Sequence, residues 1–150
     1  MNSEIQILKD ELEIRNLQAR LAHLADEGDL EDYILLFTED AVWEGGAFGT
    51  KRGVEQIMKG AIARRQGGTS GPGAFTRHVL TTTMIEVDED NATGKSVFHF
   101  YTNINETPVQ AIMGVYEDKF QRKSSGWKIC YRKIISPNHL CLLYTSPSPR

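Results

Sequence analysis

Apolar residues in the first part of the chain recur with the period of a helix. They are spaced three and four residues apart, at Ile14, Leu17, Leu21 and Leu24. This spacing places them on one face of a helix from about Glu4 to Asp26. Gly28 follows as a typical helix end. The pattern therefore predicts a long amphipathic helix whose last turn holds Asp26.

Two further helices are predicted before residue 75. Asp29 can cap the first, whose apolar face is formed by Leu30, Tyr33, Ile34 and Phe37. A short strand-like run at 41–43 follows, with a glycine turn after it. The next helix is indicated by Val54, Ile57, Met58, Ala61 and Ile62. It ends at the glycine-rich segment 67–73, which we expect to border a pocket.

From Phe75 onward the pattern changes to β-rich runs separated by polar turns. Four strands are predicted, from Thr76 to Val87, Ala92 to Ile104, Val109 to Arg122 and Trp127 to Ile135. Short turns between them are typical of an antiparallel meander. We expect three N-terminal helices packed on a strongly curved, mainly antiparallel sheet, a cone-shaped α+β barrel with room for a small apolar ligand. Phe98 and Met113 are expected in the core.

The length and charge of the chain narrow its class. With 150 residues, 40% of them hydrophobic, residues 1–140 are predicted to form one domain. The net charge of -3, with both signs interspersed, favours neither nucleic acid nor membrane as a partner. The charged N-terminus lacks the apolar core of a signal peptide, which predicts a cytoplasmic protein. Cys130 and Cys141 form no disulfide framework and are expected to be inert thiols.

The last ten residues, 141–150, differ sharply from the charged and aromatic segment before them. Their sequence, CLLYTSPSPR, matches the translation of a transposon-based sequencing adapter, as read-through in a metagenomic assembly would produce. The alternative is a natural disordered tail rich in serine and proline. We expect either a non-native or a disordered segment and base no fold argument on it.

Asp26 and His78 are the main candidates for chemistry. A carboxylate in the last turn of a helix opposes the negative end of the helix dipole, so Asp26 needs a compensating partner. A histidine can remove a proton while a carboxylate fixes its tautomer. Three structural explanations remain open: Asp26 as a solvated turn residue, His78 as a strand residue bound by a backbone carbonyl, and His23 as the partner of Asp26 on the helix.

Other chemistries lack their motifs. The chain contains no HExxH or CxxC pattern and no close cluster with metal-ligand spacing. Its glycines form no phosphate-binding fingerprint, and a GxSxG nucleophile elbow is absent. We therefore predict neither a metal nor another cofactor.

The order of elements and three segments carry a family resemblance. The segments are LFTEDAVWEGG, RHVLTTTMIEVDEDNATG and VYEDKFQRKSSGWKICYRK. Between Glu4 and Ile135 the chain resembles the SnoaL-like branch of the nuclear transport factor 2-like superfamily. That branch includes hexachlorocyclohexane dehydrochlorinase, scytalone dehydratase and bile-acid dehydratase, which eliminate from ring substrates with an Asp/His pair. The resemblance implies the cone fold and a homodimer or homotrimer.

The resemblance also implies roles for individual residues. Asp26 and His78 match the Asp/His pair, and Arg132 matches a basic residue that stabilises the leaving group. A salt bridge with a carboxylate on the sheet is the alternative role for Arg132. Some of these enzymes carry Lys or Tyr where this chain has Leu21, which disfavours loss of halide.

Several aromatic residues are candidates for the wall of the cavity. Tyr33 and Trp43 are expected to line it, and Tyr101 or Tyr116 could supply a phenolic donor. His99 is a further candidate on the second long strand. Which of the strand residues face inward depends on register, because a single bulge exchanges the two faces.

The leading hypothesis is a cofactor-free lyase, preferably a dehydratase, or an isomerase that acts on a small hydrophobic cyclic substrate. His78 would be the base and Asp26 would orient it. One alternative is a non-catalytic ligand-binding or assembly module, such as the small subunit of a ring-hydroxylating dioxygenase. Another is a polyketide cyclase or ketosteroid-isomerase-like enzyme in which a carboxylate is the base.

Overall fold

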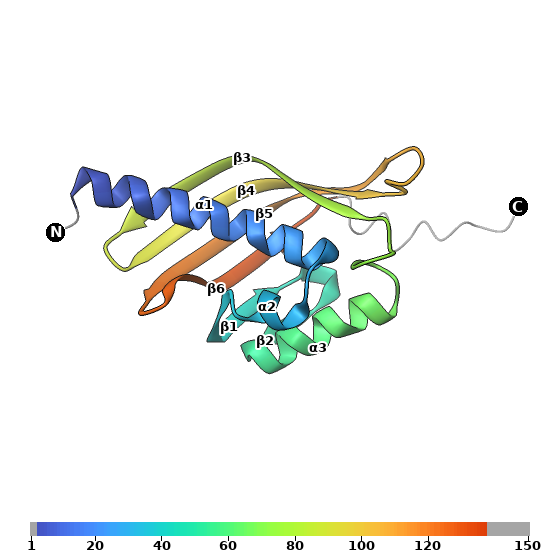
Figure 1. Cartoon of the computed structure of the whole chain (residues 1–150), viewed down its shortest axis with the longest axis horizontal. Coiled ribbons are helices and arrows are strands. Elements are labelled where there is room, and N and C mark those ends of the chain that lie inside the picture. The colour runs from blue at the N-terminus through green and yellow to red at the C-terminus, as the bar shows by residue number, and fades with distance from the viewer. Residues whose placement is uncertain (1–2, 138–150) are drawn as a thin grey trace, which may run out of the picture.

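The computed structural model describes residues 3–137, and Figure 1 shows the arrangement of its elements. The expected tail at 141–150 and the domain end at residue 140 lie outside this range. The helical elements are α1 (Glu4–Glu27), α2 (Leu30–Ile34), the short 3-10 helix η1 (Gly46–Phe48) and α3 (Gly53–Gln66). The strands are β1 (Phe37–Glu44), β2 (Thr50–Arg52), β3 (Arg77–Asp88), β4 (Asn91–Thr102), β5 (Val109–Lys123) and β6 (Gly126–Ile135). In this range we find no helix with the length and apolar character needed to cross a membrane.

The six strands form one sheet in the order β2-β1-β6-β5-β4-β3. All neighbours are antiparallel except β1 and β6, which run parallel. The predicted meander of β3 to β6 is confirmed, and so is the α+β fold with helices on one side of a curled sheet (Figure 1). The sheet ends in two separate edges, β2 and β3, so the cone stays open and the term barrel was too strong.

The first two strands correct the sequence prediction. Phe37 begins β1 and does not lie on the second helix, which ends at Ile34. The segment FTEDAVWE is rich in residues that fit a half-buried strand, and the backbone N–H of Ile129 donates to the carbonyl of Leu36 at 2.9 Å. Pairing with β6 therefore extends the predicted strand-like run at both ends. The exposed, three-residue β2 was not predicted.

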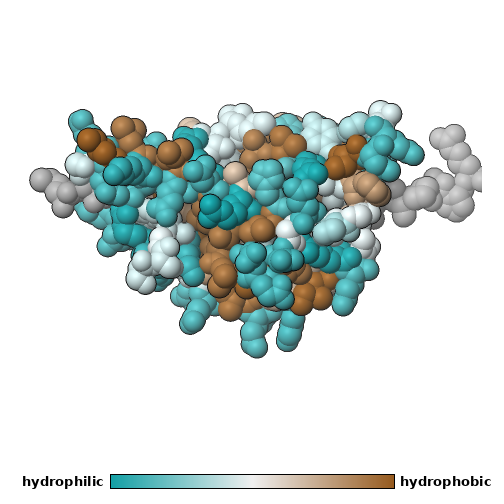
Figure 2. All heavy atoms as spheres, viewed as in Figure 1, coloured by the Kyte–Doolittle hydropathy of each residue, from teal (hydrophilic) through white to brown (hydrophobic). Residues whose placement is uncertain are grey.

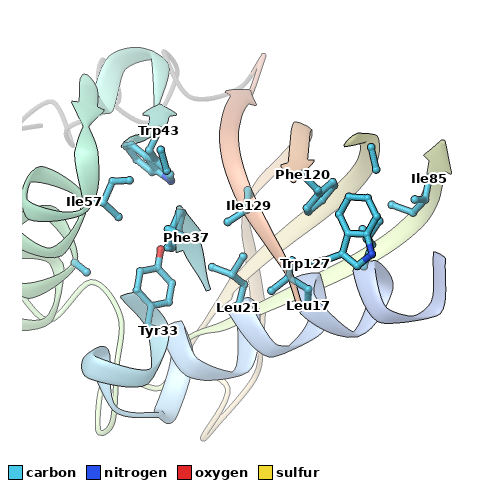
Figure 3. Close-up of a cluster of buried hydrophobic side chains, with 14 residues drawn as sticks. Leu17, Leu21, Tyr33, Phe37, Trp43, Ile57, Ile85, Phe120, Trp127 and Ile129 are labelled. Atoms are coloured by element: carbon cyan, nitrogen blue, oxygen red, sulfur yellow. The ribbon is translucent and has the colours of Figure 1, made fainter. Parts of the chain in front are cut away.

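Helix α1 is defined by its caps and by its buried face. The Ser3 hydroxyl accepts a hydrogen bond from the backbone N–H of Gln6 at 3.1 Å, as an N-cap does. At the other end, a Cβ on Gly28 would lie 2.4 Å from Leu24 Cδ2, so a larger residue there would have to displace the Leu24 side chain. The apolar stripe of α1 packs on the inner face of the sheet, where Figure 3 shows Leu17 and Leu21 against Ile129.

A buried polar cluster joins the N-terminal half of α1 to the sheet. The Asp10 side chain is 1% exposed and accepts hydrogen bonds from Arg122 Nη1 at 2.7 Å and Nη2 at 2.8 Å. Trp127 Nε1 donates to Asp10 Oδ1 at 3.0 Å. The hydrogen bonds from Arg122 lower the pKa of Asp10 to about 2, against the opposing effect of burial. This cluster lies at the opposite end of α1 from Asp26.

The two faces of the sheet differ in character. Phe98 is 4% exposed and was correctly predicted in the core, whereas Met113 is 45% exposed and the prediction for it was wrong. Because side chains alternate along a strand, Ile112 faces inward and its neighbour Met113 faces outward, opposite His99 of β4. The residue type of Met113 does not indicate from the sequence which face of the strand it occupies.

Candidate active site

A cavity of about 350 Å³ lies between the C-terminal half of α1, α3 and the inner face of the sheet. Its wall is mainly apolar, with contributions from Leu21, Leu30, Trp43, Phe98, Phe100 and Ile112. Figure 2 shows apolar surface gathered below α1 in the middle of one face, surrounded by hydrophilic side chains. A cavity of this size and lining suits a small hydrophobic molecule held by few polar contacts.

Asp26 and His78 meet at the edge of this cavity. His78 Nδ1 lies 2.6 Å from Asp26 Oδ1, and the backbone N–H of His78 donates to Asp26 Oδ2 at 2.9 Å. The Asp26 side chain is 1% exposed, while that of His78 is 22% exposed and lines the cavity. Both carboxylate oxygens of Asp26 are therefore engaged by one residue.

The position of His78 on an edge strand accounts for this double contact. Among the described strands, β3 pairs only with β4, so it lacks a strand partner on its other side. Asp26, in the last turn of α1, satisfies one backbone N–H of β3 near the start of the strand. The carboxylate thus gains the hydrogen-bond donors that its unfavourable place on the helix dipole requires.

The hydrogen bond to Asp26 assigns the tautomer of His78. An ionised carboxylate is only an acceptor, so Nδ1 carries the proton that it donates to Asp26. In the neutral ring, Nε2 then holds the lone pair and can accept a proton. The Phe100 ring packs 4.7 Å from the imidazole, centroid to centroid, and restricts its movement.

The charged neighbours of the dyad lie farther away. Arg77 Nη1 is 4.0 Å from Asp26 Oδ2 and 3.5 Å from Glu27 Oε2. His23 lies 4.0 Å from Glu27, with both side chains exposed, so the alternative in which His23 is the partner of Asp26 is not realised.

Arg132 reaches the cavity but is firmly tied to a carboxylate. Its Nε and Nη2 donate to Asp118 Oδ1 and Oδ2, both at 2.8 Å. Burial alone would lower the pKa of Arg132, but the charge and hydrogen bonds of Asp118 outweigh burial and raise it. The salt bridge that we considered as an alternative role is therefore present, with a buried partner. Nη1 is the guanidinium nitrogen that Asp118 does not engage.

Further polar side chains hold Asp118 in place. Gln18 of α1 donates through Nε2 to Asp118 Oδ2 at 3.1 Å and to the Ser96 hydroxyl at 3.0 Å. The Arg132 guanidinium carbon lies 3.8 Å from the centre of the Tyr116 ring, which stacks on Phe98. Helix α1 and the strands β4 and β5 thereby fix the orientation of Arg132.

Two tyrosines line the cavity. Tyr33 and Tyr116 both line it, and each is 5% exposed. Among the described residues, neither hydroxyl is a buried polar atom that lacks a hydrogen-bond partner. Burial raises the pKa of Tyr116, so its phenol stays protonated and can donate. Trp43, as expected, also lines the cavity.

The other two candidates do not line the cavity. His99 and Tyr101 lie on the opposite face of β4 from Phe98 and Phe100, and neither is among the residues that line this cavity. His99 instead hydrogen-bonds the Thr81 hydroxyl at 3.2 Å and the Gln110 side chain. The alternation of the strand is the physical reason, because the two phenylalanines take the apolar inner face.

Sequence reasoning missed Asp118, Arg64 and Arg65. Asp118 lies between the inward residues Tyr116 and Phe120, so the parity of the strand was a signal for a buried carboxylate. Arg64 and Arg65 end α3 and line the cavity. No pattern distinguishes them from basic residues placed to favour the helix dipole. Within residues 3–137, no three His, Cys, Asp or Glu residues are grouped to hold a metal ion.

Comparisons with known proteins agree with this architecture. A family model described as SnoaL-like domain matches residues 6–133. The comparison with curated proteins finds no match. Solved structures share the fold, among them an NTF2-like protein with a cystatin-like fold from Novosphingobium aromaticivorans, with 26% identity and a TM-score of 0.79. That comparison covers 90% of this chain and 86% of the other.

Two further structures are more distant in sequence. A protein of unknown function from Mycobacterium tuberculosis is 24% identical with a TM-score of 0.75, covering 91% of this chain and 76% of that one. A candidate scytalone dehydratase from Novosphingobium aromaticivorans is 18% identical with a TM-score of 0.68, over 86% and 85% of the two chains. At these identities the similarity establishes the fold alone.

Proposed function

We propose that this chain, which belongs to the SnoaL-like domain family, is a cofactor-free lyase that removes water from a small hydrophobic cyclic substrate. The observation that carries the proposal is the 2.6 Å contact between Asp26 and His78 at the wall of an apolar cavity. A buried carboxylate that orients a partly exposed imidazole is an arrangement suited to general base catalysis.

The reaction begins with proton removal at a ring carbon next to a carbonyl. His78 Nε2 takes the proton, and the electrons of the broken C–H bond form the new C=C bond. The C–O bond to a β-hydroxyl breaks, and the departing oxygen takes a proton from the imidazolium to leave as water. Asp26 stabilises the imidazolium while it exists. No external oxidant or reductant is needed.

Three polar groups are suited to the oxygen atoms of this substrate. The hydroxyls of the buried residues Tyr33 and Tyr116 can donate to the carbonyl or to the departing hydroxyl. Arg132 Nη1 adds a donor, although Asp118 compensates the charge of the guanidinium. The site therefore stabilises developing negative charge mainly by hydrogen bonds in a partly desolvated cavity.

The geometry favours His78 over Asp26 as the base. Both oxygens of Asp26 accept hydrogen bonds from His78, so neither is directed at a substrate. A cyclase or isomerase that uses a carboxylate base would need one of these oxygens free. A purely structural assembly module would need no such dyad, and the burial of Asp26 at 1% supports the catalytic proposal.

The test is the loss of water from a panel of cyclic β-hydroxyketones, followed by the ultraviolet absorbance of the enone product. His78→Ala should lower kcat by about a hundred- to ten-thousandfold. Asp26→Asn should lower it strongly as well, because an amide can hold the ring in the wrong tautomer. His23→Ala, which removes an exposed histidine from the same helix, is the matched control and should leave turnover unchanged.

Full turnover in a folded His78→Ala variant would exclude this mechanism. Exchange of the substrate's α-proton with solvent separates the two possible bases. Exchange that is retained in His78→Ala but lost in Asp26→Asn would instead identify the carboxylate as the base. Circular dichroism of each variant is needed, because Asp26 also holds the start of β3.

A further inference from the structure

The charges around the cavity are unevenly compensated. Asp26 faces His78, and Asp118 neutralises Arg132 through two hydrogen bonds. Arg64 and Arg65 also line the cavity, yet neither forms an ion pair with a carboxylate in the described part of the chain. None of the described lining residues is Asp or Glu. The lining of this mainly apolar cavity therefore includes two arginines that form no ion pair with a carboxylate among the described residues.

The two arginines point to different elements. The guanidinium carbon of Arg64 lies 5.2 Å from the centre of the Trp43 ring on β1. Arg65 Nη2 donates to the carbonyl of Leu24 on α1 at 2.8 Å, two residues before Asp26. A Cβ on Gly71 would lie 2.9 Å from Arg65 Nε, so the loop 67–73 packs directly on this side chain.

One hydrogen-bond donor of Arg65 lacks an acceptor. Its Nε is buried and has no hydrogen-bond partner among the described residues. An unsatisfied donor on a charged group is costly, so such an arrangement calls for an explanation. An anion beside the guanidinium would offset that cost by its charge.

Structural roles explain only part of this arrangement. Basic residues in the last turn of a helix interact favourably with its dipole, and an arginine over an indole gains a cation–π contact. The first of those roles would be met equally well at a solvent-facing position of the last turn, and the second concerns Arg64 alone. They do not explain why two consecutive arginines both border an apolar cavity without a carboxylate.

We propose that Arg64 and Arg65 bind a carboxylate carried by the apolar ring substrate. A planar two-oxygen anion matches the fork of donors on a guanidinium, and apolar surroundings strengthen that contact. The inference rests on the proposed function for the identity of this cavity as the substrate site. It narrows the substrate class from neutral cyclic molecules to cyclic acids, whose ring fills the apolar part of the cavity.

The test compares two bicyclic probes of nearly equal shape. 2-Naphthoate carries a carboxylate and 2-naphthamide is neutral, and the Kd of each is measured by calorimetry with the intact protein. The wild type should prefer the carboxylate by about tenfold or more, the value expected for a charge-assisted hydrogen bond. Arg64→Gln/Arg65→Gln should abolish the preference by weakening 2-naphthoate alone, with the Kd of 2-naphthamide within about twofold.

Controls separate this site from general electrostatics and from misfolding. Arg20→Gln removes one charge from an exposed position on α1 and should leave both Kd values unchanged. Arg64→Gln alone keeps the Arg65 contact with Leu24 and should reduce the preference while the fold is intact. Equal binding of the two probes by the wild type would overturn the proposal, as would the same loss in Arg20→Gln.

The outcome is independent of turnover. His78→Ala should stop elimination yet preserve the preference for 2-naphthoate. A carboxylate preference without any dehydration would refute the proposed lyase and leave this site standing. Dehydration of neutral ring ketones without a carboxylate preference would support the proposed lyase and refute the carboxylate site.

Discussion

Asp10 is the residue whose energetic contribution can be worked out most directly. Its carboxylate is 1% exposed and receives two hydrogen bonds from Arg122 and one from Trp127. Replacement by asparagine keeps the volume of the side chain but removes its negative charge. Arg122 then keeps at most one acceptor oxygen at this position and loses its buried counter-charge.

The size and pH dependence of the effect follow from the pKa of Asp10. The pKa falls from 3.8 to about 2, chiefly through the hydrogen bonds from Arg122. At about 1.4 kcal/mol per pKa unit, the ionised carboxylate contributes roughly 2 kcal/mol of stability. Because the folded-state pKa is the lower one, this contribution is fully present above about pH 4. It is lost as the pH falls through about 2.

Urea denaturation of wild type and Asp10→Asn measures this contribution. At pH 7 the variant should be less stable by about 2 kcal/mol, and the difference should shrink below about pH 4. Asp90→Asn is the matched control, since Asp90 also bonds Arg122, at 2.9 Å, but is 78% exposed. That exposed pair should contribute less than about 1 kcal/mol. Equal losses in the two variants, or a difference that does not change with pH, would refute the reasoning.

Two predictions concern the walls of the cavity. Asp118→Asn leaves the buried Arg132 without its counter-charge and should cost about 3–5 kcal/mol in urea denaturation, whereas the double variant with Arg132→Met should recover most of the loss. A double variant that is less stable than Asp118→Asn would contradict this. Gly45→Ala would place a Cβ 2.2 Å from Trp43 Cζ3, so it should displace the indole, alter the near-ultraviolet circular dichroism and weaken the binding of 2-naphthoate. An unchanged spectrum would argue against the tight contact.

The elements predicted correctly are those with a local signal. Helix α1 has both a periodic apolar face and a glycine end, and the strands β3 to β6 are separated by recognisable turns. The parallel pairing of β1 with β6 joins segments far apart in the sequence, such as Phe37 and Ile129, and leaves no local trace. The sequence therefore predicted the four antiparallel strands of the meander but not the parallel pairing of β1 with β6.

The site shows a similar division. Helix polarity and residue chemistry selected Asp26 and His78, but the family resemblance, not a spacing, indicated that they would meet. The placing of Tyr116 inside and of His99 and Tyr101 outside depended on strand parity, which the inward Phe98 and Phe100 could have revealed. Arg64 and Arg65 look like ordinary helix-end residues until the fold places them beside an apolar cavity.

The position of β6 between β1 and β5 also governs how the chain can fold as it is synthesised. Strand β1 is synthesised early. Its neighbour toward the middle of the strand order, β6, is among the last described segments to leave the ribosome. Synthesis proceeds at roughly 5–20 residues per second, so the apolar residues of β1 wait for seconds without their final partners. Long-range pairing of this kind slows folding. The apolar residues of β1 therefore stay exposed, and the nascent chain stays prone to aggregation, until β6 has been synthesised.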